Sequence, residues 1–174
     1  MAHRSRVGLL LGSLVLVLAI PAVAVGEGNG AARAGAELHN VAGDVVGWAQ
    51  FTEDATGILH VNVHVQGVTA GLHGIHIHNT ANCTPPFTAA GGHHNPLGAT
   101  HGEHAGDLPN LIVNVAGIGH LDGTTDHATL SASLISVFDA NGSALIIHAG
   151  EDDLQTDPTG NSGGRIACGV IVAE

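Results

Sequence analysis

Residues 57–65, GILHVNVHV, alternate apolar and polar side chains with a period of two. In a β-strand, such a period places every second side chain on one face of the sheet. One face would then carry Leu59, Val61, Val63 and Val65, and the other His60, Asn62 and His64. We expect a strand with a buried valine face and a wet face on which His60 and His64 are simply exposed.

Similar short runs of valine and isoleucine, separated by glycine, recur along the chain. We predict strands at residues 45–51, 57–65, 72–78, 111–116, 127–138, 144–148 and 165–172. Turn signals at residues 54–57, 122–123 and 141–142 suit the hairpins of an antiparallel sheet. The chain of 174 residues contains 26 glycines and few aromatic residues. This composition favours a single all-β domain, a sandwich or a barrel.

The N-terminus has the layout of a secretory signal peptide. Basic MAHRSR precedes the apolar residues 7–20 and the sequence PAVA, which ends in a small-x-small cleavage pattern. We expect residues 1–24 to be removed, residues 25–40 to be a flexible tether and residues 41–174 to form the domain. The alternative is a membrane anchor, but the apolar run is short for a span and no basic stop-transfer cluster follows. The exported protein, without stable membrane insertion, would then reside in the periplasm, in the cell envelope or outside the cell.

The charge balance excludes nucleic acid as a partner. The chain has no lysine, four arginines and fifteen acidic residues, and its formal net charge is −11. All the acidic residues and two of the arginines follow the signal peptide, so the mature chain is more acidic still. Fourteen histidines are the other anomaly, and histidine is the commonest metal ligand.

Two cysteines, Cys83 and Cys168, are the only ones in the chain. An oxidising compartment favours pairing them, so we predict a Cys83–Cys168 disulfide. The alternative is a pair of free buried thiols.

Two connections, residues 79–110 and 149–164, are too long for simple turns, and such connections usually carry function. Each follows a strand that ends in histidine, at His78 and His148. His76 and His78 share one face of their strand and can offer two nitrogen ligands. The longer connection contains His93, His101, His104 and Asp107, a set that a tetrahedral zinc site accepts. With His148 the imidazoles would also suit copper, iron or nickel, so ligand type alone leaves the metal open.

The order of these motifs resembles that of the copper/zinc superoxide dismutases of the bacterial, exported type. The matching stretches are GLHGIHIH (71–78), Cys83, GGHHNPLGATH (91–101), HAGDLPN (104–110), IIHAGEDDL (146–154) and GNSGGRIACGVI (160–171). The resemblance spans about residues 45–172. It implies a Greek-key β-barrel or sandwich of about eight antiparallel strands with two long functional loops. It also implies dismutation of superoxide to oxygen and hydrogen peroxide by alternating reduction and reoxidation of copper, an antioxidant defence outside the cytoplasm.

The resemblance assigns roles residue by residue. It implies copper ligands at His76, His78, His93 and His148, and zinc ligands at His93, His101, His104 and Asp107. His93 would bridge the two metals and take part in catalysis with Arg165, which attracts superoxide, the small-molecule substrate. Asp152 would link a copper-ligand histidine to a zinc-ligand histidine, and Cys83 and Cys168 match the family's disulfide. A homodimer is compatible with the resemblance.

Three features depart from the family pattern. Only two residues separate His101 from His104, so the zinc loop is shortened and zinc is the less secure metal. His94 replaces a residue that is usually bulky and apolar, and we expect an exposed histidine there, with a substitute ligand as the alternative. Residues 149–164 contain no lysine, which leaves Arg165 as the local cation. The competing functions are a non-catalytic exported copper-binding or buffering protein on the same fold, and a histidine-rich structural domain without metal.

Overall fold

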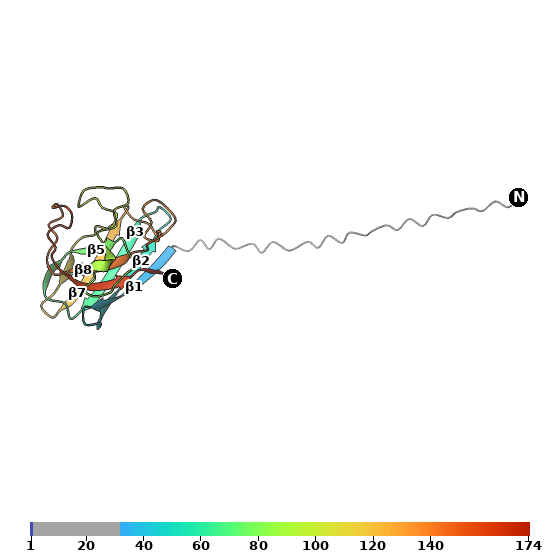
Figure 1. The fold of residues 1–174 in the computed structure, drawn as a ribbon. Coiled ribbons are helices and arrows are strands. Elements are labelled where there is room, and N and C mark those ends of the chain that lie inside the picture. Colours follow the sequence, from blue (N-terminus) through green and yellow to red (C-terminus); the bar gives the residue numbers. More distant parts are fainter. Residues whose placement is uncertain (2–31) are drawn as a thin grey trace.

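The computed structural model describes Met1 and residues 32–174 (Figure 1). The predicted signal peptide beyond Met1, and residues 25–31 of the predicted tether, lie outside the described residues. The elements are β1 (Ala32–Asn40), β2 (Val45–Glu53), β3 (Leu59–Gln66), β4 (Gly71–His73), β5 (Ile75–His78), η1 (Thr88–Ala90), β6 (Leu111–Val113), β7 (Ile118–Thr125), β8 (Ala144–His148), β9 (Arg165–Val170) and β10 (Val172–Ala173). The all-β prediction is confirmed. Within the described part of the chain, no helix combines the length and hydropathy needed to cross a membrane.

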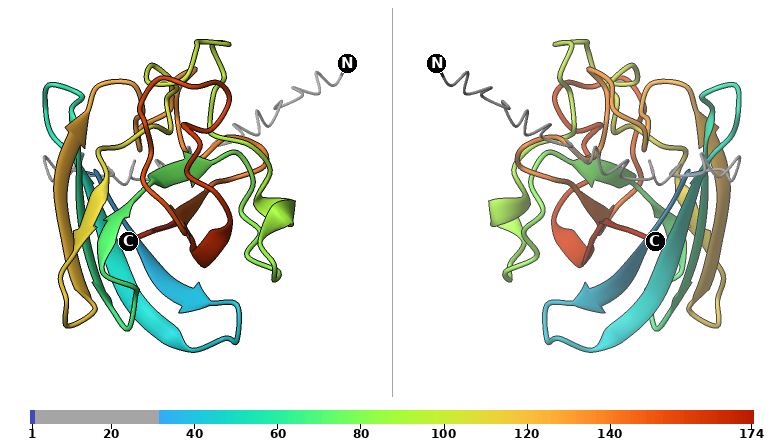
Figure 2. Two further views of the ribbon diagram at one scale, coloured as in Figure 1. Left: turned by 90° about the vertical axis from the view of Figure 1, so that its left-hand side faces the viewer. Right: turned by 90° about the vertical axis from the view of Figure 1, so that its right-hand side faces the viewer.

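The strands form one antiparallel sheet that nearly closes into a barrel (Figure 2). Their order is β4-β6-β7-β3-β2-β1-β9-β8-β5, and β10 pairs with β1. The outermost strands, β4 and β5, are consecutive in the chain and separated only by Gly74. The predicted strand 72–78 divides there because β4 pairs with β6 whereas β5 pairs with β8. The two ends of the sheet therefore meet at Gly74, where an added Cβ would lie 2.7 Å from the Cβ of Ser162.

The strand predicted from residues 57–65 is β3, and its valine face is buried as expected. His60 is exposed as expected, but His64 is half-buried because its ring packs between those of Trp48 and His120. The valine face joins a core that includes Leu38, Phe51, Ile75, Ile77, Leu111 and Leu145. Burying one such side chain contributes about 1.5–3 kcal/mol, so the alternation in β3 is a main determinant of the barrel.

The prediction of a flexible tether is wrong for residues 32–40, which form β1. Ala34, Ala36 and Leu38 alternate on its buried face, and β1 pairs with β2 along its length and with β9 at its end. Alanine and glycine carry a weak hydrophobic signal, so the period of two was hidden by the composition. The barrel therefore begins at β1, before residue 41.

A strand also replaces a predicted turn. Asp122 and Gly123 lie inside β7, where they pair with Asn62 and Val61 of β3. The Asp-Gly turn signal is overridden because β7 pairs with β3 along its whole length, from Ile118 to Thr125. The prediction of a turn at residues 122–123 is wrong.

Residues 127–138, predicted as a strand, form bends and turns instead. Part of this segment is hydrogen-bonded to a carboxylate instead of to a neighbouring strand. Glu53, at the end of β2, accepts hydrogen bonds of 2.6 Å from the backbone N–H groups of Leu130 and Ser131 and from the Ser131 hydroxyl. Burial raises the pKa of Glu53, but these hydrogen bonds outweigh burial and hold the pKa below its usual value.

We predict that Glu53→Ala lowers the free energy of unfolding by about 2–3 kcal/mol, because buried N–H groups lose their acceptor. Denaturant unfolding would measure the change, with Glu37→Ala as the control, since the Glu37 side chain is 66% exposed. Because the pKa of Glu53 is depressed in the folded state, its contribution is present above the ordinary glutamate pKa and is lost as the pH falls below it. Equal effects of the two substitutions at neutral pH would contradict this role.

Candidate metal centre

Four histidines converge beside the neighbouring strands β5 and β8, and we call them the strand-end cluster: His76, His78, His93 and His148. One ring nitrogen of each lies within 4.8 Å of the others. The antiparallel pairing sets the backbones of His78 and His148 at opposite ends of the two strands, and their side chains reach toward each other, with His148 Nε2 3.4 Å from His78 Nε2. A backbone bridge between His78 and His93 adds the residue from the long loop. These are the four residues to which the resemblance assigned copper.

A second set, the loop cluster, consists of His93, His101, His104 and Asp107. Asp107 Oδ1 lies 2.8 Å from His93 Nδ1, 3.3 Å from His104 Nδ1 and 3.4 Å from His101 Nδ1. Burial raises the pKa of Asp107, but the hydrogen bond with His93 and the neighbouring histidines lower it to about 2. His93 belongs to both clusters, so one imidazole joins them.

The shortened loop reaches this geometry through three backbone hydrogen bonds of 2.8 Å. Ile77 N–H donates to Gly106 O, His94 N–H donates to Ile77 O, and Gly106 N–H donates to His94 O. The residues beside His94 and Gly106, namely His93 and Asp107, are thereby placed against β5. An added Cβ at Gly106 would lie 2.1 Å from Ile77 O, so only glycine permits this approach.

Asp152 connects the clusters on their buried side. Its two carboxylate oxygens lie 2.5 Å from His76 Nε2 and 2.8 Å from His101 Nε2, and its side chain is fully buried. Burial raises the pKa of Asp152, but the two histidine hydrogen bonds outweigh burial and lower it. A carboxylate at Nε2 fixes the imidazole tautomer and leaves Nδ1 as the lone pair.

The free nitrogens fit a metal site. His76 Nδ1, His93 Nε2 and His101 Nδ1 are buried and have no hydrogen-bond partner within the described residues. Such an unsatisfied polar atom costs about 1–3 kcal/mol, which a bound metal ion would recover. Burial is also the main cause that lowers the pKa of His78 to about 2 and of His148 to about 4. Both rings are therefore neutral at neutral pH, as metal ligands must be.

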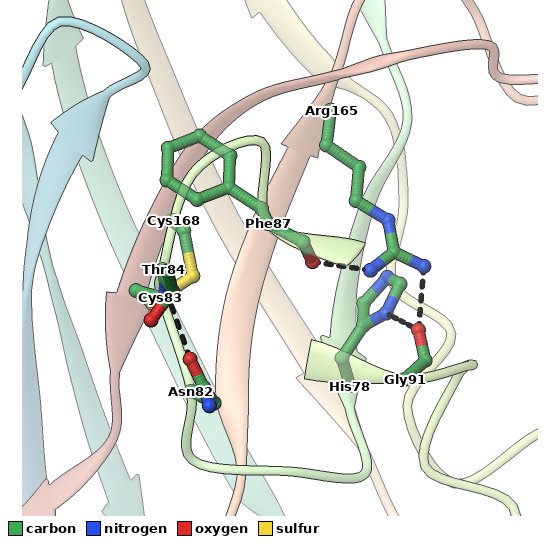
Figure 3. The surroundings of a disulfide bond; sticks show 8 residues. All are labelled: His78, Asn82, Cys83, Thr84, Phe87, Gly91, Arg165 and Cys168. Carbon is green, nitrogen blue, oxygen red and sulfur yellow. Dashed lines mark hydrogen bonds between the residues drawn. A yellow bond between two sulfur atoms is a disulfide. The ribbon is translucent and has the colours of Figure 1, made fainter. Parts of the chain in front are cut away.

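Arg165 borders the strand-end cluster (Figure 3). Its guanidinium donates one hydrogen bond of 2.5 Å to Phe87 O and another to Gly91 O. His78 Nδ1 donates to the same Gly91 carbonyl at 2.9 Å. The structure contains the predicted Cys83–Cys168 disulfide, which ties this loop to β9, the strand that carries Arg165. The disulfide thus anchors the segment that orients both Arg165 and His78.

His94 is buried, with only 2% of its surface exposed, so the expectation of an exposed histidine is wrong. It belongs to neither cluster. Its backbone is hydrogen-bonded to Ile77 and Gly106, and its ring lies beside the backbone of Ile135. Burial lowers the pKa of His94, opposed by the hydrogen bond at Ile135.

Sequence reasoning missed three residues that support the clusters. Asn110 exchanges two hydrogen bonds of 2.9 Å with the backbone of Asp152. His73 Nδ1 lies 2.7 Å from the carbonyl oxygen of His148, and Asp157 Oδ1 accepts from the His101 N–H at 2.6 Å. The positions of Asn110 in the HAGDLPN motif and of His73 in GLHGIHIH were the only signals, because all three contacts join segments that are distant in sequence.

Comparison with known proteins agrees with this geometry. The sequence profile described as "Copper/zinc superoxide dismutase (SODC)" matches residues 45–171. The chain belongs to the copper/zinc superoxide dismutase family. It is 38% identical over 173 residues to superoxide dismutase [Cu-Zn] 2 of Aquifex aeolicus, covering 94% of this chain and 96% of that one. It is 39% identical over 157 residues to superoxide dismutase [Cu-Zn] of Deinococcus radiodurans, covering 79% of this chain and 83% of that one.

One solved structure is similar to this chain at the same level of sequence identity. The crystal structure of a double mutant of a SOD-like protein from Bacillus subtilis has a TM-score of 0.75 and 38% identity, and covers 78% of this chain and 95% of that chain. Membership of the copper/zinc superoxide dismutase family indicates which metals the two clusters would bind. The strand-end and loop clusters of this chain could bind copper and zinc.

We predict that Gly106→Ala weakens zinc binding at least about 10-fold, because the new Cβ separates the loop from Ile77 and with it the ligands of the loop cluster. Competition with a chelator would measure zinc affinity. The control is Gly92→Ala in the same loop, where an added Cβ meets no atom within 4 Å. Unchanged zinc affinity in Gly106→Ala would show that the backbone contact does not shape the cluster.

Proposed function

We propose that the protein is a superoxide dismutase that converts superoxide and protons into oxygen and hydrogen peroxide outside the cytoplasm. The observation that carries the proposal is that the two clusters share His93, and that Arg165 lies beside His78 of the strand-end cluster (Figure 3). The strand-end cluster would hold copper and the loop cluster would hold zinc. Bound copper supplies one-electron redox chemistry, which zinc, a metal without redox activity, does not supply.

Arg165 would attract the superoxide anion. Its charge opposes protonation of His78 and His148, so it acts at the strand-end cluster. Its hydrogen-bond acceptors are the carbonyl oxygens of Phe87 and Gly91. Among the described residues no carboxylate pairs with it, so its positive charge stays available to an anion.

His93 would supply a proton to the reduced product. Its Nδ1 is held at 2.8 Å by Asp107, while its Nε2 points into the strand-end cluster without a partner among the described residues. Nε2 is therefore the ring atom at which a proton can be held and released. Asp152 would keep His76 and His101 in one orientation while this occurs.

Export of the protein is part of the proposal. A disulfide such as Cys83–Cys168 persists in an oxidising compartment, and the basic and apolar segments of residues 1–24 have the composition of a signal peptide. The mature chain would consist of a short N-terminal segment and the barrel, which starts at β1.

The experiment is metal analysis combined with a superoxide-consumption assay on protein purified from outside the cytoplasm, whose intact mass reports removal of residues 1–24. We expect copper and zinc together with rapid superoxide consumption. His148→Ala should lower the rate about 100-fold or more, because even partners outside the ligand set cost about 10–100-fold. His60→Ala, on an exposed strand face, is the control.

Full activity in His148→Ala would overturn the ligand assignment. Copper binding without superoxide consumption would refute the enzyme proposal and support the non-catalytic copper-binding alternative. That alternative is favoured by one observation, the similarity to a protein described only as SOD-like.

We also predict a weak dependence of the rate on salt. The net negative charge, which is larger in the mature chain than the −11 of the full sequence, repels superoxide, whereas Arg165 attracts it over a distance comparable with the ~8–10 Å screening length at moderate salt. Because these effects oppose each other, the rate should change less than about threefold between low and moderate ionic strength. Stopped-flow measurements across salt concentrations would test this, and a rate that falls steeply as salt rises would contradict it.

A further inference from the structure

A separate histidine pair lies on the outer face of the barrel, away from both buried clusters. His64 on β3 and His120 on β7 are direct cross-strand partners. Their Nδ1 atoms are 3.2 Å apart and their ring centroids 4.2 Å apart. The His120 side chain is 44% exposed and His64 is half-buried, so solvent reaches the pair from the side of His120. Neither residue belongs to the strand-end or loop cluster.

A carboxylate orients one ring of this pair. His120 Nε2 donates to Asp122 Oδ2 at 2.7 Å, and the Asn62 amide donates to the other carboxylate oxygen. A carboxylate at one ring nitrogen fixes the tautomer and leaves the other nitrogen as a lone pair. The Nδ1 of His120 therefore accepts the hydrogen bond of 3.2 Å from His64 Nδ1–H, and it becomes a ligand atom once that proton leaves. The arrangement is the carboxylate–histidine pairing that supports metal ligands in proteins.

Apolar side chains flank the pair along one row of the sheet. Ile112, His120, His64 and Trp48 are successive cross-strand partners on β6, β7, β3 and β2. The Trp48 ring lies 4.3 Å from the His64 ring, centroid to centroid. Neighbours on both sides restrict the two imidazoles to the space above the strands, while the solvent side stays open.

We propose that His64 and His120 form a surface site for a divalent first-row transition metal ion, with copper(II) as the preferred ion. Two imidazole nitrogens about 2.05 Å from one ion are about 2.9 Å apart at the right angle of tetragonal copper(II) and about 3.3 Å apart at the tetrahedral angle. The Nδ1 atoms are already 3.2 Å apart. A rotation of the two rings about χ2 directs both lone pairs at the ion, and the proton between them moves through solvent to His64 Nε2. Water completes the coordination.

Copper(II) is preferred because it binds imidazole nitrogen more tightly than the other divalent ions of the first row. With two protein ligands and open access to water, the site binds more weakly than the buried four-ligand clusters and exchanges its ion readily. It does not depend on the proposed dismutase activity. The chain would thus carry an exchangeable metal site in addition to its buried ones.

The test uses the only tryptophan of the chain, Trp48, as the reporter. The full protein is loaded with copper and zinc, unbound metal is removed, and copper(II) is titrated near neutral pH in a non-chelating buffer while tryptophan fluorescence is recorded. Paramagnetic copper at His64 quenches the fluorescence of Trp48, whose ring centroid lies 4.3 Å from that of His64. We expect saturable quenching by one further equivalent of copper. His120→Ala, which leaves the Trp48–His64 contact in place, should weaken the apparent affinity at least about 10-fold.

Two further variants sharpen the test. Asp122→Asn should also weaken binding about 10-fold, because the tautomer of His120 is no longer fixed. His60→Ala should leave the titration unchanged, since His60 lies on the same strand face but opposite Thr124 and beside Asp54. Quenching that does not saturate, or equal affinity in His120→Ala and the parent, would overturn the proposal. Failure of the buried clusters to load metal would contradict the proposed function, whereas the effect of His120→Ala tests this surface site alone.

Discussion

The geometry of the metal centre depends on one buried carboxylate, Asp152, which accepts hydrogen bonds from His76 and His101. These rings come from β5 and from the loop of residues 79–110, and Asp152 itself comes from the loop after β8. Asn110 holds its backbone by donating to the Asp152 carbonyl and accepting from the Asp152 N–H. One side chain thus joins three segments that are far apart in sequence. Because each Nε2 is occupied by Asp152, each Nδ1 is left to bind metal. In a dry interior such hydrogen bonds are strong and costly to break.

The side of the site that faces the substrate depends on a shared acceptor. The Gly91 carbonyl receives hydrogen bonds from both Arg165 and His78 (Figure 3), so a displacement of this carbonyl would alter the cation and the ligand together. Its segment is tied to β9 by the Cys83–Cys168 disulfide. A covalent bond that needs an oxidising compartment therefore helps to position Arg165 against the strand-end cluster.

The sequence predicts those parts of the fold whose signal is local. β3 and β8 were predicted because their branched apolar side chains repeat clearly, whereas β7 was missed because its inward positions include Gly119 and Gly123. Gly119 is required there: an added Cβ would lie 2.8 Å from both Val113 and Val65. The ligand residues were predictable from composition and motif order. The convergence of the shortened loop was not, because it rests on backbone contacts between Ile77 and Gly106, which no spacing reveals.

Histidine pairs on two strands show what the long loops contribute. His76 and His78 on β5 and His60 and His64 on β3 occupy equivalent positions, on the strand face opposite the core. Every residue of β5 is nevertheless buried, whereas the corresponding face of β3 is open. The difference lies in the loops that cover each strand. Residues 79–110 and 149–164 fold over β5 and place His93, Asp107 and Asp152 beside its histidines. Loss of water is the main cause of the low pKa of His78, and it keeps protons from competing with metal. The loops therefore convert an ordinary strand face into a metal centre, while the same residue type on β3 stays at the surface, where any ion it binds remains in exchange with solvent.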